Sequence, residues 1–276
     1  MSPSLPATDR PLMRFAVCRT LLLGLWAVFG LVLNSHAQQR LIPLEKLQSG
    51  LHYSGAEVQS LQTDEFANPG NIALDSGTKS WAKPDGKSNK SCQSCHGDLV
   101  KMKGVSTRYP AIDKATGKLF NLEDRIRNCR VKKQKAAEWT FESDELVAMT
   151  LAVTSSSRGL PLQAQIDGAA KSYFENGQRL FMTRQGQMNL ACTNCHDQHY
   201  GQKLYTDPLS QGQANGYPLY RIDWQRVASL ERRLRFCYTG VKAEIPPWGH
   251  SDIRDISLYL MWRGQGLLVE APAVRK

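Results

Sequence analysis

Apolar and small residues recur at steps of three and four positions in two stretches of the chain. The first stretch holds Leu146, Met149, Thr150 and Val153, and the second holds Ile253, Ile256, Ser257 and Leu260. This spacing places each set on one face of an amphipathic helix. Ser143 and Ser251 stand just before the two stretches and are expected to cap the helices. No segment shows sustained strand alternation, so the pattern predicts a mainly α fold.

Two shorter, more polar helices are predicted upstream of these stretches. Asn121 and Ser229 suit their N-caps, and each is followed within the first turn by an acidic residue, which the helix dipole favours. We expect these helices to end at Cys129 and Cys237.

The beginning of the chain follows a different pattern. Arg10, Arg14 and Arg19 precede an apolar run of thirteen residues, 21–33, and Ser35-His36-Ala37 then supplies small residues for a cleavage site. This order is typical of a secretory signal peptide, and the run is short for a membrane span. We therefore predict a signal peptide over residues 1–37; the alternative is an uncleaved anchor.

The chain also repeats itself. At an offset of 100, Cys92-Gln-Ser-Cys95-His96 aligns with Cys192-Thr-Asn-Cys195-His196, and at 108 the segment 121–129 aligns with 229–237. The two amphipathic stretches align at 107. Three blocks in one order indicate an internal duplication with an insertion of eight residues in the second copy. Each copy should form a helix, a turn with the paired cysteines, a helix ending in cysteine and a longer helix.

The repeat suggests how the chain is divided. Residues 38–73 match neither copy and are predicted to form an N-terminal extension after the signal peptide. Residues 74–160 and 161–276 are expected to form two tandem cytochrome c-like domains, with residues 155–168 as a linker rich in Ser, Gly and Pro.

The repeated Cys-x-x-Cys-His motif indicates covalent attachment of haem. Two thiols at this spacing reach the two vinyl groups of one porphyrin, and the following imidazole reaches its iron. With this composition the motif arises by chance at roughly 1 in 70,000 positions. We predict two covalently bound c-type haems, the first on Cys92 and Cys95 and the second on Cys192 and Cys195, with His96 and His196 as iron ligands.

Other uses of these cysteines are less consistent with the pattern. A four-cysteine zinc site would have to combine pairs from separate repeats, and it leaves the two histidines without a role. A thioredoxin-like redox pair usually sits beside a βαβ unit, which the sequence lacks. Six cysteines remain after the signal peptide, so three disulfides are the remaining alternative for an exported chain.

Each haem needs a second axial ligand if its iron is six-coordinate. Met149 and Met261 lie within the apolar pattern of the long helices, where a core methionine is the simpler interpretation. Cys129 and Cys237 are equivalent to each other, and arginines flank both. Arg125 and Arg233 each stand four residues before their cysteine, on the same helical face, where a guanidinium favours a thiolate. We therefore predict Cys129 and Cys237 as iron ligands; a disulfide between them is the alternative.

Thiolate ligation has a consequence for redox behaviour. A thiolate donor stabilises ferric iron, so haems ligated in this way should have low reduction potentials. Such haems serve poorly as a simple relay to high-potential acceptors, which points to chemistry on sulfur.

The charge of the chain is positive. Its net charge is +10, and residues 1–37 hold three basic residues and one acidic residue, so their removal leaves +8. Export argues against nucleic acid as the partner. A basic surface can steer an anionic substrate or an acidic protein, although it can also serve solubility alone.

Several segments together resemble the SoxA family, the dihaem subunits of SoxAX cytochrome complexes in bacterial thiosulfate oxidation. These segments are 66–70, 90–98, Arg108-Tyr109-Pro110, 189–192, Gly216-Tyr217-Pro218-Leu219-Tyr220-Arg221, Arg232-Arg233-Leu234-Arg235-Phe236-Cys237 and 262–267. The likeness covers nearly all of the chain after residue 37. The paired Cys-x-x-Cys-His motifs alone would fit many dihaem cytochromes.

The resemblance implies an L-cysteine S-thiosulfotransferase in the periplasm. Such an enzyme joins thiosulfate oxidatively to a cysteine of the SoxYZ carrier protein and passes electrons to a monohaem cytochrome, SoxX. By the same resemblance, Cys237 ligates the second haem, carries a persulfide during turnover and is catalytic, whereas Cys129 only ligates the first haem. Arg233 is implied to contact substrate, and Arg263 to line the same pocket.

Two other functions remain open from the sequence. One is a non-enzymatic dihaem electron carrier of the periplasm, which would tolerate loss of Cys237 apart from a changed potential. The other is a dihaem peroxidase, which needs one iron open to peroxide, and two thiolate ligands argue against it.

Overall fold

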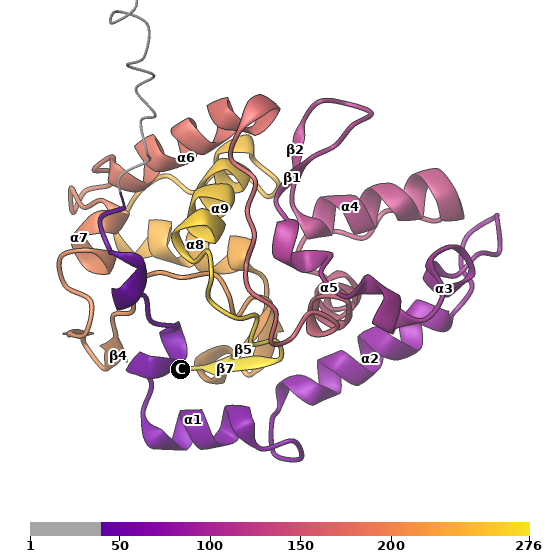
Figure 1. Ribbon diagram of the computed structural model, residues 1–276, viewed down its shortest axis with the longest axis horizontal. Coiled ribbons are helices and arrows are strands. Elements are labelled where there is room, and N and C mark those ends of the chain that lie inside the picture. The colour runs from indigo at the N-terminus through magenta and orange to yellow at the C-terminus, as the bar shows by residue number, and fades with distance from the viewer. Residues whose placement is uncertain (1–39) are drawn as a thin grey trace, which may run out of the picture. The chain divides into compact units, whose positions relative to one another are not determined.

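The computed structural model describes residues 40–276, and Figure 1 shows how their helices are arranged. The predicted signal peptide, residues 1–37, lies outside the described residues. The α-helices are α1 (Ala56–Thr63), α2 (Gly70–Ala82), α3 (Cys92–His96), α4 (Leu122–Cys129), α5 (Asp144–Ser155), α6 (Lys171–Met182), α7 (Cys192–His196), α8 (Leu230–Gly240) and α9 (Ser251–Arg263). The prediction of a mainly α fold is confirmed.

Short elements connect these helices. The 3-10 helices cover Leu44–Lys46, Gly50–Tyr53, Leu99–Met102, Ser106–Arg108, Gly168–Ala170 and Ile222–Trp224, and a π-helical turn covers Arg130–Gln134. The strands are β1 (Ala111–Ile112), β2 (Leu119–Phe120), β3 (Lys203–Leu204), β4 (Asp207–Pro208), β5 (Leu219–Arg221), β6 (Arg226–Ala228) and β7 (Ala273–Arg275). Strands β1 and β2 form one hairpin and β3 and β4 another, and β5 lies between β6 and β7 in a three-stranded sheet.

The predicted caps are largely present. The Asn121 side chain accepts a hydrogen bond from the Asp124 backbone N–H at 2.8 Å, and the Asp124 carboxylate accepts one in return from the Asn121 N–H. Ser143 and Ser229 cap α5 and α8 in the same manner. The prediction for Ser251 was wrong by one residue. His250 has the extended backbone of a cap and its Nδ1 accepts from the Asp252 N–H at 3.2 Å, so Ser251 is the first helical residue.

The two cysteine-bearing helices end differently. Helix α4 stops at Cys129, as predicted, and the chain continues through the π-helical turn. Helix α8 does not stop at Cys237 but continues to Gly240. Cys237 therefore lies inside its helix, one turn from the end, and its neighbours are fixed on both sides by helical geometry.

Two helix pairs organise the core. Helix α2 packs on α5, and α6 packs on α9. At both crossings a glycine faces a carbonyl group: a methyl group at Gly77 would overlap Ala148 O, and one at Gly177 would overlap Asp255 O. Met149 and Met261 are buried in these cores, which agrees with their interpretation as core residues. Val147 and Leu151 of α5 belong to the same apolar cluster as α9, so residues 40–276 form one compact unit.

The N-terminal residues of this unit lie against its C-terminal part. The Gln48 backbone N–H donates to the Gln211 side chain at 2.8 Å, and the Gln62 side chain accepts from the Val274 N–H at 2.9 Å. The Asn68 amide then donates to Pro272 O at 3.0 Å, two residues before α2 begins at Gly70. This segment thus covers β7 and the loop after α7 before the chain enters α2.

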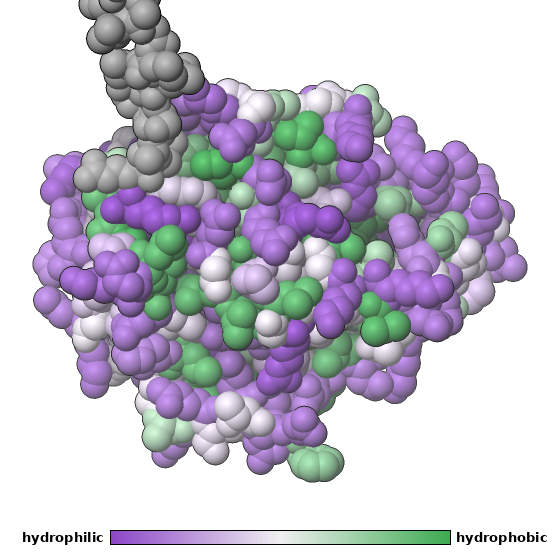
Figure 2. Space-filling view, viewed as in Figure 1, coloured by the Kyte–Doolittle hydropathy of each residue, from purple (hydrophilic) through white to green (hydrophobic). Residues whose placement is uncertain are grey.

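The surface is of mixed character. Figure 2 shows hydrophilic side chains over much of the visible face, with apolar side chains dispersed between them. Among residues 40–276 no helix combines the length and the apolar character needed to cross a bilayer.

The glycine crossing on α6 provides a test of the core. We expect Gly177→Ala to lower the free energy of unfolding by about 1–3 kcal/mol, because its methyl group must push α6 away from the Asp255 carbonyl. Denaturant unfolding followed by circular dichroism measures the change. Gly240→Ala, at a helical position with open space around it, is the matched control and should unfold like the wild type. Equal stability of both variants would show that the crossing tolerates a side chain.

Candidate haem centres

The two Cys-x-x-Cys-His motifs form one-turn helices, α3 and α7, that begin with the first cysteine. Both turns are closed at the N-terminal side by a side chain. Ser91 Oγ accepts from the Ser94 N–H at 3.0 Å, and Asn194 Oδ1 accepts from the Ala191 N–H at 2.9 Å. Each turn therefore presents two thiols and an imidazole from a locally fixed backbone.

The imidazole of His196 is held in one tautomer. Its Nδ1 lies 2.8 Å from the backbone oxygen of Ser210, and a carbonyl can only accept, so Nδ1 carries the proton. Nε2 is then the unprotonated nitrogen that can ligate iron, and the carbonyl fixes the plane of the ring. Gly212, with φ of +72°, packs on the same ring: a methyl group there would lie 2.9 Å from His196 Cγ.

The Cys237 thiol lies beside this imidazole. Burial raises the pKa of the thiol, but Arg233, the adjacent His196 and the charge of Arg221 together outweigh burial and lower that pKa to about 7. Besides burial, the charge of the Cys237 thiolate raises the pKa of the Cys192 and Cys195 thiols. The structure thus brings the two attachment cysteines, the histidine and Cys237 together, and their roles at a haem stay a prediction.

The first centre has the same framework with a different charge balance. Cys129 is close enough to Cys92 to raise the pKa of that thiol, in addition to the effect of burial. Burial also raises the pKa of Cys129 itself, and Arg125 and Lys133 oppose that shift without reversing it. His96 lies against Trp81, with ring centroids 5.8 Å apart. Cys129 is thus the less acidic of the two candidate thiol ligands.

The two equivalent arginines account for part of this difference. Arg125 is paired with a carboxylate: it donates to Asp113 at 2.6 Å and to the Tyr109 hydroxyl at 3.2 Å. Arg233 contacts the Phe236 ring at 5.4 Å, but its buried Nη1 has no hydrogen-bond partner. A guanidinium N–H without a partner in a buried place is available to an anion.

The donor set suits haem at both centres and excludes the alternatives left open by the sequence. All six cysteines of the described residues are free thiols, so Cys129 and Cys237 form no disulfide. Among residues 40–276 no three Cys, His, Asp or Glu side chains converge closely enough to hold one metal ion directly, as a zinc site requires. Each centre instead offers two thiols and one imidazole on a single turn, with a further thiol nearby, which is the donor set of a covalently attached haem.

Comparisons with known proteins agree with this geometry. Residues 76–162 match the family model described as the SoxA/TsdA cytochrome c domain. The chain is 38% identical to the "L-cysteine S-thiosulfotransferase subunit SoxA" of Pseudaminobacter salicylatoxidans over 85% of its length and 82% of that protein's, and 34% identical to the subunit of the same name from Rhodovulum sulfidophilum over 84% and 81%. The chain belongs to the SoxA family. The crystal structure of SoxXA from P. pantotrophus is also similar, with a TM-score of 0.81 and 34% identity over 83% of this chain and 87% of the matched one.

Arg263 lies in a different environment from Arg233 in this SoxA family member. Its guanidinium donates to Asp197 at 2.6 Å and to Gln211 O at 3.1 Å, and it stacks on Phe181 at 4.5 Å. These contacts hold the loop after α7 against α9. The charge of Arg263 acts on the attachment thiol of Cys192. The structure therefore supports a positioning role for Arg263, and its contact with substrate stays a prediction.

Arg221, in contrast, was given no role by the sequence analysis. It is 6% exposed, its Nε has no partner, and its charge lowers the pKa of Cys237. A signal was present in the repeat, because at the offset of 108 this arginine aligns with Asp113. An unlike charge at equivalent positions marks a place where the two copies differ in chemistry.

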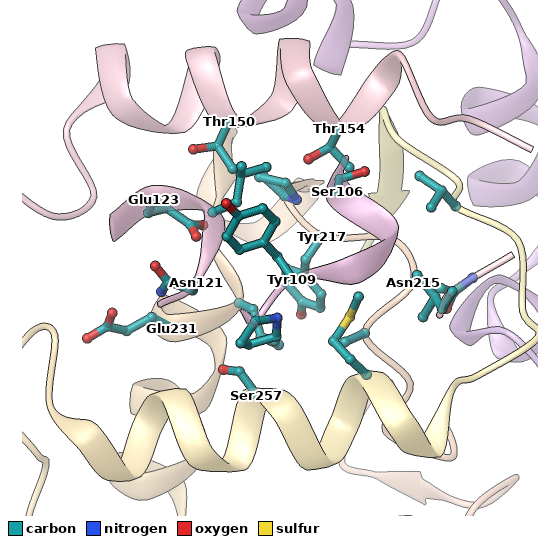
Figure 3. A pocket seen from close by; sticks show the side chains of 18 residues that line it. Ser106, Tyr109, Asn121, Glu123, Thr150, Thr154, Asn215, Tyr217, Glu231 and Ser257 are labelled. Atoms are coloured by element: carbon teal, nitrogen blue, oxygen red, sulfur yellow. The ribbon is translucent and has the colours of Figure 1, made fainter. Parts of the chain in front are cut away.

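A cavity lies away from the second centre, between α5 and α9 (Figure 3). It measures about 70 Å³, and its polar lining includes Tyr109, Tyr217 and Glu231. Ser106 Oγ and Asn215 Oδ1 line it without a protein partner, so it suits a few ordered water molecules. Burial raises the pKa of Glu231 from its usual 4.5 to about 7, although the Gly249 N–H and Arg254 favour its charged form. This carboxyl therefore titrates near neutral pH.

Gly212 provides a test of the second centre. We expect Gly212→Ala to displace the His196 ring and so to change the spectrum of a haem bound at this centre, without preventing its attachment to Cys192 and Cys195. Intact mass and electron paramagnetic resonance measure the two properties. Gly159→Ala has a similarly positive φ with open space around it, so it introduces the backbone strain alone. An unchanged spectrum in Gly212→Ala would contradict the contact.

The raised pKa of Glu231 predicts that the free energy of unfolding depends on pH. Its folded-state pKa is raised, so its contribution is fully present below pH 4.5 and is lost as the pH rises through about 7. The loss amounts to roughly 3 kcal/mol at most. Glu231→Gln keeps an acceptor for the Gly249 N–H, so we expect its unfolding free energy to fall less between pH 5 and 8 than that of the wild type. Glu57→Gln, on the exposed surface of α1, should retain the wild-type dependence.

Proposed function

We propose that the chain carries two covalently attached c-type haems, one on Cys92 and Cys95 and one on Cys192 and Cys195. His96 and His196 would ligate the two irons from one side, and Cys129 and Cys237 from the other. The support is the recurrence of one donor set at both centres, with each second cysteine placed near its attachment pair. The haems supply the route for electrons.

We also propose that residues 74–160 and 161–276 are two tandem cytochrome c-like halves that arose by duplication. In support, β1–β2 and β5–β6 pair in the same register at an offset of 108, with Ala111 opposite Phe120 and Leu219 opposite Ala228. The glycine crossings of α2 with α5 and of α6 with α9 also correspond. Residues 38–73 would then be an added segment.

For the reaction, we propose the S-thiosulfotransferase activity that the names of the relatives carry. Thiosulfate is joined through its outer sulfur to a carrier cysteine thiol, which loses its proton. Formation of this S–S bond releases two electrons, which leave through the haems to a separate cytochrome. The products are the cysteine S-thiosulfonate, one proton and the reduced acceptor.

One observation carries this proposal: an acidic thiol, Cys237, faces His196 next to a buried guanidinium N–H that has no partner. Arg233, one helical turn before Cys237, favours the thiolate form of this cysteine, and a thiolate is the nucleophile in sulfur exchange. A persulfide of Cys237 would present a second sulfur atom farther from the helix. Arg233 would hold the sulfonate oxygens of thiosulfate by charge-assisted hydrogen bonds.

The partners follow from the same comparison. We propose that the chain assembles with a monohaem SoxX subunit, as in the SoxXA crystal structure, and that the SoxYZ carrier supplies the acceptor cysteine. Removal of residues 1–37 would place the protein in the periplasm, where both haems are attached. Intact mass of the periplasmic protein tests the signal cleavage and the haem number together.

Variants at the second centre test the activity. We expect Cys237→Ser to abolish thiosulfate-dependent cytochrome reduction, because the nucleophile is lost while both haems stay attached through other cysteines. Arg233→Ala should lower kcat/KM for thiosulfate by about 10- to 100-fold, as loss of a charge-assisted contact predicts. Turnover is measured with the partner cytochrome and the carrier, and haem content by mass.

The matched control for these variants is Arg125→Ala, at the equivalent position of the first half. It should retain thiosulfate turnover, because Arg125 is already paired with Asp113. A Cys237→Ser protein that turns over normally would support the non-enzymatic electron carrier instead.

A further inference from the structure

Two hairpins lie at equivalent places in the two halves. Strand β1 pairs with β2 and β5 with β6 in the same register, and the residue after Ile112 corresponds to the last residue of β5. These positions are Asp113 and Arg221. Each lies next to the helix that carries the second cysteine, since Asp113 contacts Arg125 of α4 and Arg221 is close to Arg233 of α8. The same structural position therefore holds opposite charges in the two halves.

In the first half the charges cancel. Asp113 is 5% exposed and its carboxylate accepts from Arg125 at 2.6 Å and from the Thr116 hydroxyl at 2.7 Å. Arg125 also donates to Tyr109. The charge of this arginine is thus neutralised inside the protein, and a dianion approaching Cys129 would meet a buried carboxylate.

In the second half the charges add. Burial and the charge of the nearby Arg233 lower the pKa of Arg221, and both arginines act on Cys237. Arg221 Nε and Arg233 Nη1 are buried without a hydrogen-bond partner. The carboxylates nearest to Arg221 are those of Asp207 at 3.9 Å and Asp223 at 3.8 Å, at the outer limit of ion pairing.

Aromatic rings hold the two guanidinium groups in place. Arg221 lies over Trp224 at 5.1 Å and Arg233 over Phe236 at 5.4 Å. The two rings pack edge to face with centroids 5.5 Å apart. Contact with a ring face fixes a guanidinium without consuming its N–H groups, which stay available in the plane of the group. An anion bound between these two like charges would offset their repulsion.

We propose that Arg221 and Arg233 form a two-pronged site for the sulfonate of a dianionic substrate beside Cys237, and that Asp113 at the equivalent position prevents the first half from binding the same anion. This proposal rests on the proposed function and adds a substrate-binding residue to it. Which of the two centres binds the anion would then depend on the residue at one hairpin position, Arg221 or Asp113. The competing assignment for Arg221 is a haem propionate, which carries the same charge as the substrate.

The test uses the holoprotein in its complex and two readouts. Sulfate is an inert dianion, and its binding is followed through the electron paramagnetic resonance signals of the two haems; thiosulfate turnover is measured in parallel. We expect Arg221→Gln to retain both haems with unchanged signals in the absence of anion. It should weaken sulfate binding and raise KM for thiosulfate by about tenfold or more. Arg221→Asp should do so more strongly, because the new carboxylate can pair with Arg233.

The reciprocal variant examines the first half. Asp113→Asn removes the carboxylate and frees Arg125, so we expect the signal of the first haem to respond to sulfate, which the wild-type signal does not. Arg226→Gln serves as the charge control. It removes one positive charge from β6, opposite Arg221 in the hairpin, where Arg226 is paired with Asp144 at 2.7 Å. This control should bind sulfate like the wild type.

Three results would overturn the proposal. Wild-type sulfate binding in Arg221→Gln would remove Arg221 from the anion site. Loss of the second haem, or a changed signal without anion, would assign Arg221 to the cofactor. An unresponsive first haem in Asp113→Asn would show that Asp113 does not exclude anions there. If the wild-type complex fails to turn over thiosulfate, the proposed function fails, but the sulfate measurements still judge the anion site.

Discussion

The second centre depends on keeping a thiolate and unneutralised guanidinium groups together in a largely buried place. Each would be costly alone, since burial favours the neutral thiol and a buried cation without a counter-charge is unfavourable. Together they stabilise each other, which is why the pKa of Cys237 falls to about 7 while that of Cys129, with a paired arginine, is raised. The surrounding structure fixes this arrangement: α8 spaces Arg233 and Cys237 by one turn, and the Ser210 carbonyl orients His196 opposite the thiol.

The features that could be predicted from the sequence are those encoded by local spacing. The Cys-x-x-Cys-His turns, the amphipathic helices and three of the four predicted caps depend on residues within a few positions of one another. The cap at Ser251 was missed because the preceding His250 also offers a ring nitrogen as acceptor. The sequence does not show which of the two centres binds substrate, because Arg125 and Arg233 have the same spacing from their cysteines. What separates them is the residue on a neighbouring hairpin, and its contact with the helix appears only when the chain is folded.

The pairing of the two halves shows how one framework holds two different centres. Backbone features recur at fixed offsets: glycines where helices cross, a two-stranded hairpin in one register and a one-turn helix for the attachment cysteines. These positions have little freedom, because a side chain at Gly77 or Gly177 would collide with a main-chain carbonyl. Charge at the ends of the hairpins is not restricted in this way. Function could therefore diverge through side-chain charge without disturbing the packing.

The carboxylates near Arg221 limit how tightly this site can hold an anion. Two buried guanidinium groups with no acid nearby would hold a dianion strongly, and a tightly held product would slow turnover. Asp207 and Asp223 lie almost 4 Å from Arg221 and are partly exposed, so they reduce the local potential without occupying the N–H groups directly. Such carboxylates lower the affinity for the ground-state anion while leaving the short hydrogen bonds of the arginines to the substrate available. In the first half a buried acid, Asp113, takes the position of Arg221 and lies 2.6 Å from Arg125, and at that distance its charge closes the site.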